Sequence, residues 1–358
     1  MRTAQGRPVL VSIERNTIKL EGNASPDDPC IQAKVQREID YTEAFLKQNI
    51  PVSITCYVGG TRCTKQAEMI SKLLLRNPRY ASLITPHLTC NFSPDDTYQY
   101  LRALQSQGIQ HILALSGDKL DPSFKTFARD PLLRHAPQLV SIAHLVDKPR
   151  RNAPSPHACS LHGNSFDISV AYSSFNGRHP VTEQRKLEQK LIAGACSIKT
   201  QPVTYADAGL VDRDLAYLAG CLPLRNISYS VIYYQTTAMA EHIKKKCGIT
   251  VPQEILNRLH YQDFEGKTDG TSKVRVLNEG LHIAAQSIAC LIHSGIERIN
   301  IMGVRKPETF SKVWMLVPHY LEGYQLPKRA AFTEHQRRAE TSGQIKYISN
   351  VFSPSNVS

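Results

Sequence analysis

The sequence predicts an α/β fold, a (β/α)8 TIM barrel with a long connection between strands 4 and 5 and a C-terminal extension. Three observations support this fold class. Eight short apolar runs lie between residues 9 and 304, a helical pattern follows each of the first seven, and several runs end in polar groups. Strands that alternate with helices favour a parallel sheet, and eight such units commonly need ~250 residues or more.

A doubly wound open sheet would show the same alternation. It is the second choice, because no Gly-x-Gly-x-x-Gly turn opens the first helix. Residues 305–316 could supply the eighth helix of the barrel. The eight strands are predicted, in order, at 9–14, 52–56, 84–90, 111–118, 167–173, 197–203, 229–234 and 299–304.

Two segments are expected to be irregular. Residues 134–166 contain four prolines and a basic run, which indicates a long connection, and such connections are usually functional or mobile. Residues 325–358 are rich in charge, and in Ser near the end, and could form one short helix around 332–340. The predicted organisation is a barrel catalytic domain over 1–324 followed by a C-terminal extension over 325–358.

Polar residues at the predicted strand ends indicate where a site would lie. Active sites of barrels lie at the C-terminal ends of the strands. A purely structural barrel would not need a polar group at so many of these ends. The run from His111 to Asp118 is the most informative, because it is a buried apolar strand that stops at Gly-Asp. The polar strand ends are Glu14, Thr55, His87, Asp118, Tyr172, Gln201, Tyr234 and Arg305.

The composition is that of a soluble protein with one core. Of the 358 residues 41% are hydrophobic, and no apolar run approaches the ~20 residues needed to span a bilayer. The N-terminus lacks the apolar region of a signal peptide. The nine cysteines are scattered and never in Cys-x-x-Cys spacing, so a cytoplasmic location with free thiols, and no metal ion, is the simplest expectation.

The formal net charge of +12 could indicate nucleic acid, or an anionic cofactor and substrate. Basic clusters occur at 148–151, 244–246 and 327–329, and none is interleaved with aromatic residues as a stacking platform would be. Solvated surface charge is the first interpretation and attraction of anionic small molecules the second. No nucleic-acid or membrane partner is expected. A homo-oligomer is compatible with the fold class, although no sequence feature identifies an interface.

The helix after strand 5 carries a charged face. Glu183, Lys186 and Lys190 are spaced i, i+3 and i+7, beside a stripe formed by Leu187 and Leu191. On the residues alone, a solvated face with an i,i+3 ion pair is favoured.

Taken together, several segments resemble methylenetetrahydrofolate reductase in order and spacing from residue 9 to 316. The Pro-His-Leu-Thr-Cys and Ala-Leu-x-Gly-Asp segments are specific to that family, whereas the Ala-Gly-Ala helix end is only supportive. The segments that carry the resemblance are Val11–Glu14, Pro86–Cys90, Gly108–Asp118, Ile168–Tyr172, Lys190–Ala195 and Thr200-Gln201.

The resemblance implies a flavin-carrying barrel that moves a hydride from NAD(P)H via FAD to 5,10-methylenetetrahydrofolate and gives 5-methyltetrahydrofolate. Glu14 would be the acid that opens the one-carbon bridge, and Asp118 and Gln201 would bind the pterin. The resemblance also implies that the charged helix face of Glu183, Lys186 and Lys190 points toward the cofactor. The residues that would contact FAD are Thr55, His87, Leu115, Ser116, Gly117, Asp118, Phe127, Ala128, Tyr172, Glu183, Lys186 and Lys190.

These residue types suit that chemistry. Protonating a weakly basic amine needs an acid of raised pKa, which a carboxyl at the end of a buried strand can have. A carboxylate and an amide can pair with the N–H donors and the carbonyl of a pterin ring. Structural interpretations stay open: Asp118 could cap a helix, His87 could be a core histidine, Glu14 a surface carboxylate, and Gln201 a partner of backbone groups.

Departures from the family indicate a divergent member. Ser116 stands where the family has an arginine that helps to hold the flavin, so the affinity for FAD is in doubt. Arg15–Lys19 replaces the usual aromatics and Pro-Pro pair. Tyr233–Thr237 leads directly into a helix where the family has a Pro-Gly-Ile-x-Pro loop, and Val304–Lys306 replaces Leu-Asn-Arg.

Two other functions therefore stand beside the reductase. One is a related tetrahydrofolate-dependent one-carbon enzyme that has lost the flavin or changed its reaction, for example by direct hydride transfer. The other is a non-catalytic barrel that binds folate or a protein partner.

Overall fold

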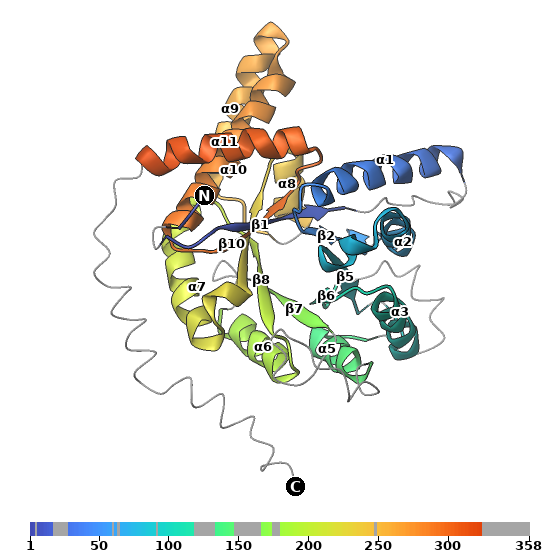
Figure 1. Ribbon diagram of the computed structural model, residues 1–358. Coiled ribbons are helices and arrows are strands. Elements are labelled where there is room, and N and C mark those ends of the chain that lie inside the picture. Colours follow the sequence, from blue (N-terminus) through green and yellow to red (C-terminus); the bar gives the residue numbers. More distant parts are fainter. Residues whose placement is uncertain are drawn as a thin grey trace.

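Eight parallel strands close into a barrel in the computed structural model of the chain (Figure 1). β1 pairs with both β10 and β2, which closes the barrel and confirms the predicted fold class and all eight predicted strands. The structure describes residues 1–3, 6–16, 28–58, 61–62, 65–90, 92–117, 133–146, 166–173, 180–246 and 249–323. The barrel strands are β1 (Leu10–Arg15), β2 (Val52–Ile54), β5 (Ile84–Thr89), β6 (His111–Leu115), β7 (Asp167–Tyr172), β8 (Ser197–Pro202), β9 (Ile227–Ile232) and β10 (Arg298–Met302).

Helices surround the barrel and cover the apolar outer face of its strands (Figure 1). Side-chain caps start two of them, because the oxygens of Asp28 and Ser93 accept from backbone N–H groups of the first turn. None of the described helices is long and apolar enough to cross a bilayer. The covering helices are α1 (Pro29–Leu46), α2 (Gln66–Arg76), α3 (Pro94–Ser106), α5 (Ala136–Leu145), α6 (Pro180–Ile192), α7 (Ala208–Cys221) and α11 (Pro307–Gly323). The helix that follows β9, α8 (Thr237–Lys246), belongs to a second apolar cluster.

The expectation of an irregular segment over 134–166 is wrong for its first part. Residues 136–145 form α5, which packs against β6 and α3 with Leu139 and Val140 buried. Pro137 lies in the first turn of this helix, where a missing N–H costs little. The rest of the connection, 147–165, and the C-terminal extension from 325 onward lie outside the described residues.

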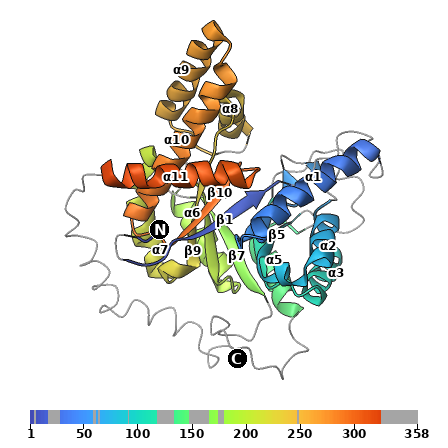
Figure 2. The same ribbon diagram turned by 45° about the horizontal axis from the view of Figure 1, so that its top comes forward.

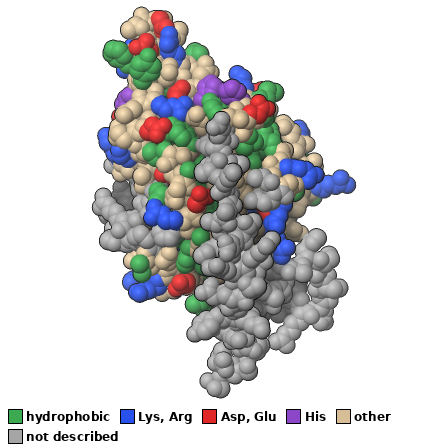
Figure 3. All heavy atoms as spheres, turned by 90° about the vertical axis from the view of Figure 1, so that its left-hand side faces the viewer, with side chains coloured by type: hydrophobic (Ala, Val, Ile, Leu, Met, Phe, Trp, Pro, Cys, Tyr) green, Lys and Arg blue, Asp and Glu red, His purple; other side chains and the backbone are tan. Residues whose placement is uncertain are grey.

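Two further helices follow α8 and were not among the predicted elements. α9 (Gln253–Asp269) and α10 (Ser272–His293) project from the barrel beside α11 as an arm (Figure 2). Buried side chains such as Ile255, Leu259 and Ile283 form a separate apolar cluster in this arm. Hydrophobic side chains also gather near its free end (Figure 3), where Tyr261 and Phe264 are 60% and 67% exposed.

The arm approaches the end of β9 closely at Gly280. A Cβ atom there would lie 2.0 Å from the carbonyl oxygen of Tyr234, so Gly280→Ala must displace the helix or the strand end. We expect this variant to lose about 1–3 kcal/mol of unfolding free energy, as other overpacked sites do. Gly209 in α7 is the matched control, because a Cβ meets nothing within 4 Å there. Gly209→Ala should gain up to about 1 kcal/mol, and equal effects in denaturant titrations would contradict the close contact.

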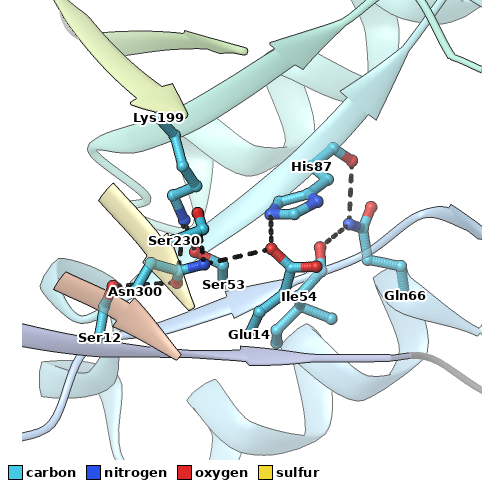
Figure 4. Close-up of polar contacts among 9 residues, drawn as sticks. All are labelled: Ser12, Glu14, Ser53, Ile54, Gln66, His87, Lys199, Ser230 and Asn300. Atoms are coloured by element: carbon cyan, nitrogen blue, oxygen red, sulfur yellow. Dashed lines mark hydrogen bonds and ion pairs between the residues drawn. The ribbon is translucent and has the colours of Figure 1, made fainter. Parts of the chain in front are cut away.

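The barrel interior is polar where barrels of this type usually hold branched apolar side chains. Ser12 and Ser53 point inward from β1 and β2, Lys199 from β8, Ser230 from β9 and Asn300 from β10 (Figure 4). Hydrogen bonds link all five. This polar layer continues to the C-terminal end of β1, so the fold places a charged and hydrogen-bonded group directly beneath the barrel mouth.

Candidate functional site

Glu14 points into the barrel from the C-terminal end of β1 (Figure 4). The Asn300 amide donates to Glu14 Oε2 at 3.5 Å, and His87 Nε2 lies 3.8 Å from the same oxygen. Glu14 is paired in register with Met302 of β10 and Ser53 of β2. The predicted acid and the predicted cofactor contact His87 are therefore brought together by the closure of the barrel.

Lys199 approaches the same group from β8. Its ammonium donates to Ser53 Oγ at 2.6 Å and to Asn300 Oδ1 at 3.3 Å. Asn300 is fully buried and also bonds Ser12 at 3.1 Å and Ser230 at 3.3 Å. Asn300 thus connects the carboxyl of Glu14 to the amine of Lys199.

Burial controls the protonation of this group. It raises the pKa of Glu14, although the nearby Lys199 and the Asn300 hydrogen bond act in the opposite direction. Burial, with a smaller effect of Lys199, holds the pKa of His87 well below its usual range, so the imidazole is neutral at pH 7. Burial also lowers the pKa of Lys199 to about 8, against the attraction of Glu14. The site therefore combines a carboxyl whose pKa is raised and an amine whose pKa is lowered, both by burial.

Gln66 of α2 holds the backbone at His87 by hydrogen bonds. The amide nitrogen of Gln66 donates to the carbonyl oxygens of Ile54 at 2.6 Å and His87 at 3.0 Å, and Tyr100 donates to the amide oxygen at 2.8 Å (Figure 4). Gln66 is buried and ties the ends of β2 and β5 together. This link fixes the backbone of His87 relative to the end of β2.

Of the two predicted pterin ligands, the structure describes Gln201, which lies across the barrel mouth from β1 and β2. Gln201 is at the end of β8, where its amide oxygen accepts from Ser173 at 3.2 Å. Gly117, two residues after β6, has a φ of 79°, a left-handed conformation that favours glycine. Asp118, Phe127 and Ala128 lie outside the described residues. Thr55 directly follows β2 and Leu115 ends β6, the two strands that flank β5 in the barrel.

The predicted flavin contact of Tyr172 does not fit its position. Its hydroxyl lies 3.5 Å from Asp214 of α7, and its ring centroid is 6.3 Å from that of Tyr217 on the same helix. Successive side chains of a strand point to opposite faces, and Tyr172 takes the outward one. The side chain is therefore part of the packing between the sheet and the helices.

The charged face of α6 has partners of its own. Lys186 forms an ion pair with Glu183 at 2.7 Å and is 55% exposed, which is the solvated i,i+3 pair that the spacing favours. Lys190 donates to the Ala171 carbonyl at 2.6 Å. The Ser116 hydroxyl accepts from the Ala136 N–H at 3.2 Å and carries no charge. A flavin diphosphate needs positive charge on this side of the mouth; Lys190 and Lys186 carry such charge, whereas Ser116 does not.

A cleft of about 380 Å³ opens beside the ends of β9 and β10, next to the strand that carries Glu14. Three of its side chains are cations, Arg305, Lys306 and Lys312, and no described carboxylate is near enough to form an ion pair with any of them. The cleft should attract anions. It is lined by Tyr233, Gln235, Val274, Leu277, Asn278, Leu281, Arg305, Lys306, Thr309 and Lys312.

Three members of the polar group, Ser53, Lys199 and Asn300, are not among the residues predicted from the sequence. A signal for Ser53 and Asn300 exists, because polar and apolar residues alternate in β2 and β10; β8, which carries Lys199, shows no such regular alternation. Such alternation means that one face of a strand contacts polar groups.

The chain is similar in sequence and in fold to known proteins. The family model described as methylenetetrahydrofolate reductase matches residues 36–317. Among solved structures, an uncharacterized protein from Clostridium thermocellum, described as binding two copies of 5-methyl-5,6,7,8-tetrahydrofolic acid, has a TM-score of 0.54 at 13% identity. That match covers 87% of this chain and 95% of the other. A 2,3-dimethylmalate lyase has a TM-score of 0.40 at 10% identity and covers 96% and 94%. No curated protein matches the sequence.

Proposed function

The chain belongs to the methylenetetrahydrofolate reductase family, and from this we propose that it reduces 5,10-methylenetetrahydrofolate to 5-methyltetrahydrofolate with hydride from NAD(P)H. The observation that carries the proposal is Glu14, a carboxyl of raised pKa at the end of a barrel strand, beside a neutral histidine. The methyltetrahydrofolate bound by the similar solved structure supports a reduced folate as the ligand.

Glu14 supplies the proton that opens the one-carbon bridge. The new N–H bond uses the lone pair of the bridging nitrogen, and the electron pair of the cleaved C–N bond then stays on that nitrogen. The carbon is left as an iminium that accepts hydride. His87 helps by remaining neutral, since a positive charge 3.8 Å away would favour the ionised carboxylate. Gln201 and Asp118 would hold the pterin ring beside this acid.

A second candidate is the same reduction without flavin. FAD, when bound in this family, carries the hydride from the nicotinamide to the folate. The outward position of Tyr172 and the uncharged Ser116 in place of the family's arginine favour direct transfer in this chain. The visible spectrum of the protein after incubation with excess FAD and desalting separates the two forms. A retained flavin spectrum supports the carrier, and a colourless, folded protein that still forms product supports direct transfer.

Turnover tests the reaction itself. The full-length protein should form 5-methyltetrahydrofolate from 5,10-methylenetetrahydrofolate with NADH or NADPH, or oxidise 5-methyltetrahydrofolate with an artificial electron acceptor. Absence of turnover in both directions, with folded protein, would overturn the proposal and leave a folate-binding or partner-binding barrel.

The cationic cleft should contribute to the affinity for folate, because a reduced folate ends in carboxylates. Arg305→Ala and Lys312→Ala should each weaken 5-methyltetrahydrofolate binding by roughly two- to fivefold, the effect of a partly solvated ion pair worth ~0.2–1 kcal/mol. Lys244→Ala, an exposed lysine on α8, is the matched control. Calorimetric titration at low and high salt measures the difference, and equal affinities in all three variants would place the folate tail elsewhere.

A further inference from the structure

Three titratable side chains face the same volume inside the barrel: Glu14 on β1, His87 on β5 and Lys199 on β8 (Figure 4). The other described groups around the Lys199 amine are neutral. They are Ser53 of β2 and Asn300 of β10, both hydrogen-bonded to it. The local charge is therefore decided by how Glu14 and Lys199 share protons.

This arrangement poses a problem for an acid. An ammonium group near a carboxyl favours the ionised carboxylate. While Lys199 is protonated, its charge favours a Glu14 without a proton, and the acid then needs a group from which to gain one. The Ser53 hydroxyl accepts from Lys199 at 2.6 Å, and Ser53 is the register neighbour of Glu14 on β2, so rotation of the Ser53 side chain would bring its hydroxyl to the carboxylate. A hydroxyl can accept from one partner while donating to another.

We propose that Lys199 is the proton store of this site: its ammonium group holds the proton that Glu14 passes to the substrate, and the Ser53 hydroxyl connects the two. Lys199 acts through Glu14 and is a positioning residue, and the inference rests on the function proposed above. In each turnover an N–H bond of Lys199 breaks as the O–H bond of Glu14 forms. That O–H bond then breaks as the bridging nitrogen of the folate gains the proton. Lys199 is left neutral and takes one proton from solvent before the next turnover.

The pKa of Lys199, lowered by burial to about 8, suits this role. The amine is protonated at neutral pH and still gives up its proton far more readily than an ordinary lysine. Loss of this proton above about pH 8 should therefore lower turnover and give the pH profile an alkaline limb. The apparent pKa of that limb belongs to the coupled pair of Glu14 and Lys199.

Titration by NMR tests the store without any turnover. In protein labelled at lysine and glutamate side chains, one lysine should titrate near pH 8. Its signal should disappear in Lys199→Met and in Lys199→Arg and persist in Lys72→Met, which removes the partner of Glu68 on α2. The Glu14 midpoint should rise in Lys199→Met, because the opposing charge is lost. A Lys199 that titrates near the ordinary lysine value, or a Glu14 midpoint unchanged by Lys199→Met, overturns the inference.

The pH profile of turnover separates a proton store from a simple counter-ion. Arginine keeps the charge but does not release its proton, so Lys199→Arg should lose the alkaline limb near pH 8 and at least ~10-fold in rate, part of the usual effect of proton transfer. A Lys199→Arg enzyme with the wild-type profile contradicts the store. If the expected NMR titrations appear but no folate is turned over, the proposed function fails and the coupled pair remains.

Discussion

Glu14→Gln lowers turnover of 5,10-methylenetetrahydrofolate by at least the ~10²-fold typical of a removed general acid, while binding of 5-methyltetrahydrofolate and of any flavin is retained. Glutamine keeps the shape of the side chain and its contact with Asn300 but has no acidic proton. Steady-state rates and equilibrium binding on one preparation measure both effects. Glu297→Gln, at the opposite end of the barrel where Glu297 pairs with Arg7, is the control and should keep the wild-type rate. An unchanged rate in Glu14→Gln would assign the acid to another residue.

Asn300→Leu has the largest expected effect on stability. The amide of Asn300 satisfies Ser12, Lys199 and Ser230 in the barrel interior, and leucine leaves these groups without that partner. Unsatisfied buried polar groups cost ~1–3 kcal/mol each, so we expect a loss of roughly 2–4 kcal/mol of unfolding free energy, with partial compensation by water at Lys199 and Ser12.

A control variant in the barrel interior shows how much stability is lost when a single hydrogen bond is removed. Ser169 and Ser197 share one hydrogen bond of 2.6 Å between β7 and β8. Ser169→Ala should cost only about 0.5–1.5 kcal/mol, the value of a single hydrogen bond. Urea titrations compare the variants. If Asn300→Leu costs no more than Ser169→Ala, the amide does not hold the polar layer together.

The strands and their order could be predicted because the outward face of each barrel strand is apolar and leaves a run in the sequence. Glu14, His87 and Gln201 could be placed near the C-terminal ends of strands for a related reason, since they lie in the last residues of such runs. The polar layer could not be assembled in the same way. Ser12 and Asn300 are 288 residues apart, and only closure of the barrel brings them into contact.

The failures also have physical causes. Tyr172 was assigned to the mouth by its match to a family position, but the two-residue alternation of β7 turns its side chain toward α7. The segment 134–166 was expected to be irregular because of its prolines, yet Pro137 lies in the first turn of α5. The arm of α9 and α10 depends on packing around Gly280 and on a second apolar cluster. No local sequence motif predicts either of these contacts.

Equilibrium binding of 5-methyltetrahydrofolate to the full-length protein, compared between the wild type and Gln201→Ala, tests the central claim most directly. The claim is that a reduced folate binds at the C-terminal mouth of this barrel, between Gln201 and Glu14. It predicts saturable binding to the wild type and roughly tenfold weaker binding to Gln201→Ala, the loss expected when one or two hydrogen bonds of about 1 kcal/mol are removed. Absence of saturable binding, or equal affinity in the two proteins, would contradict it.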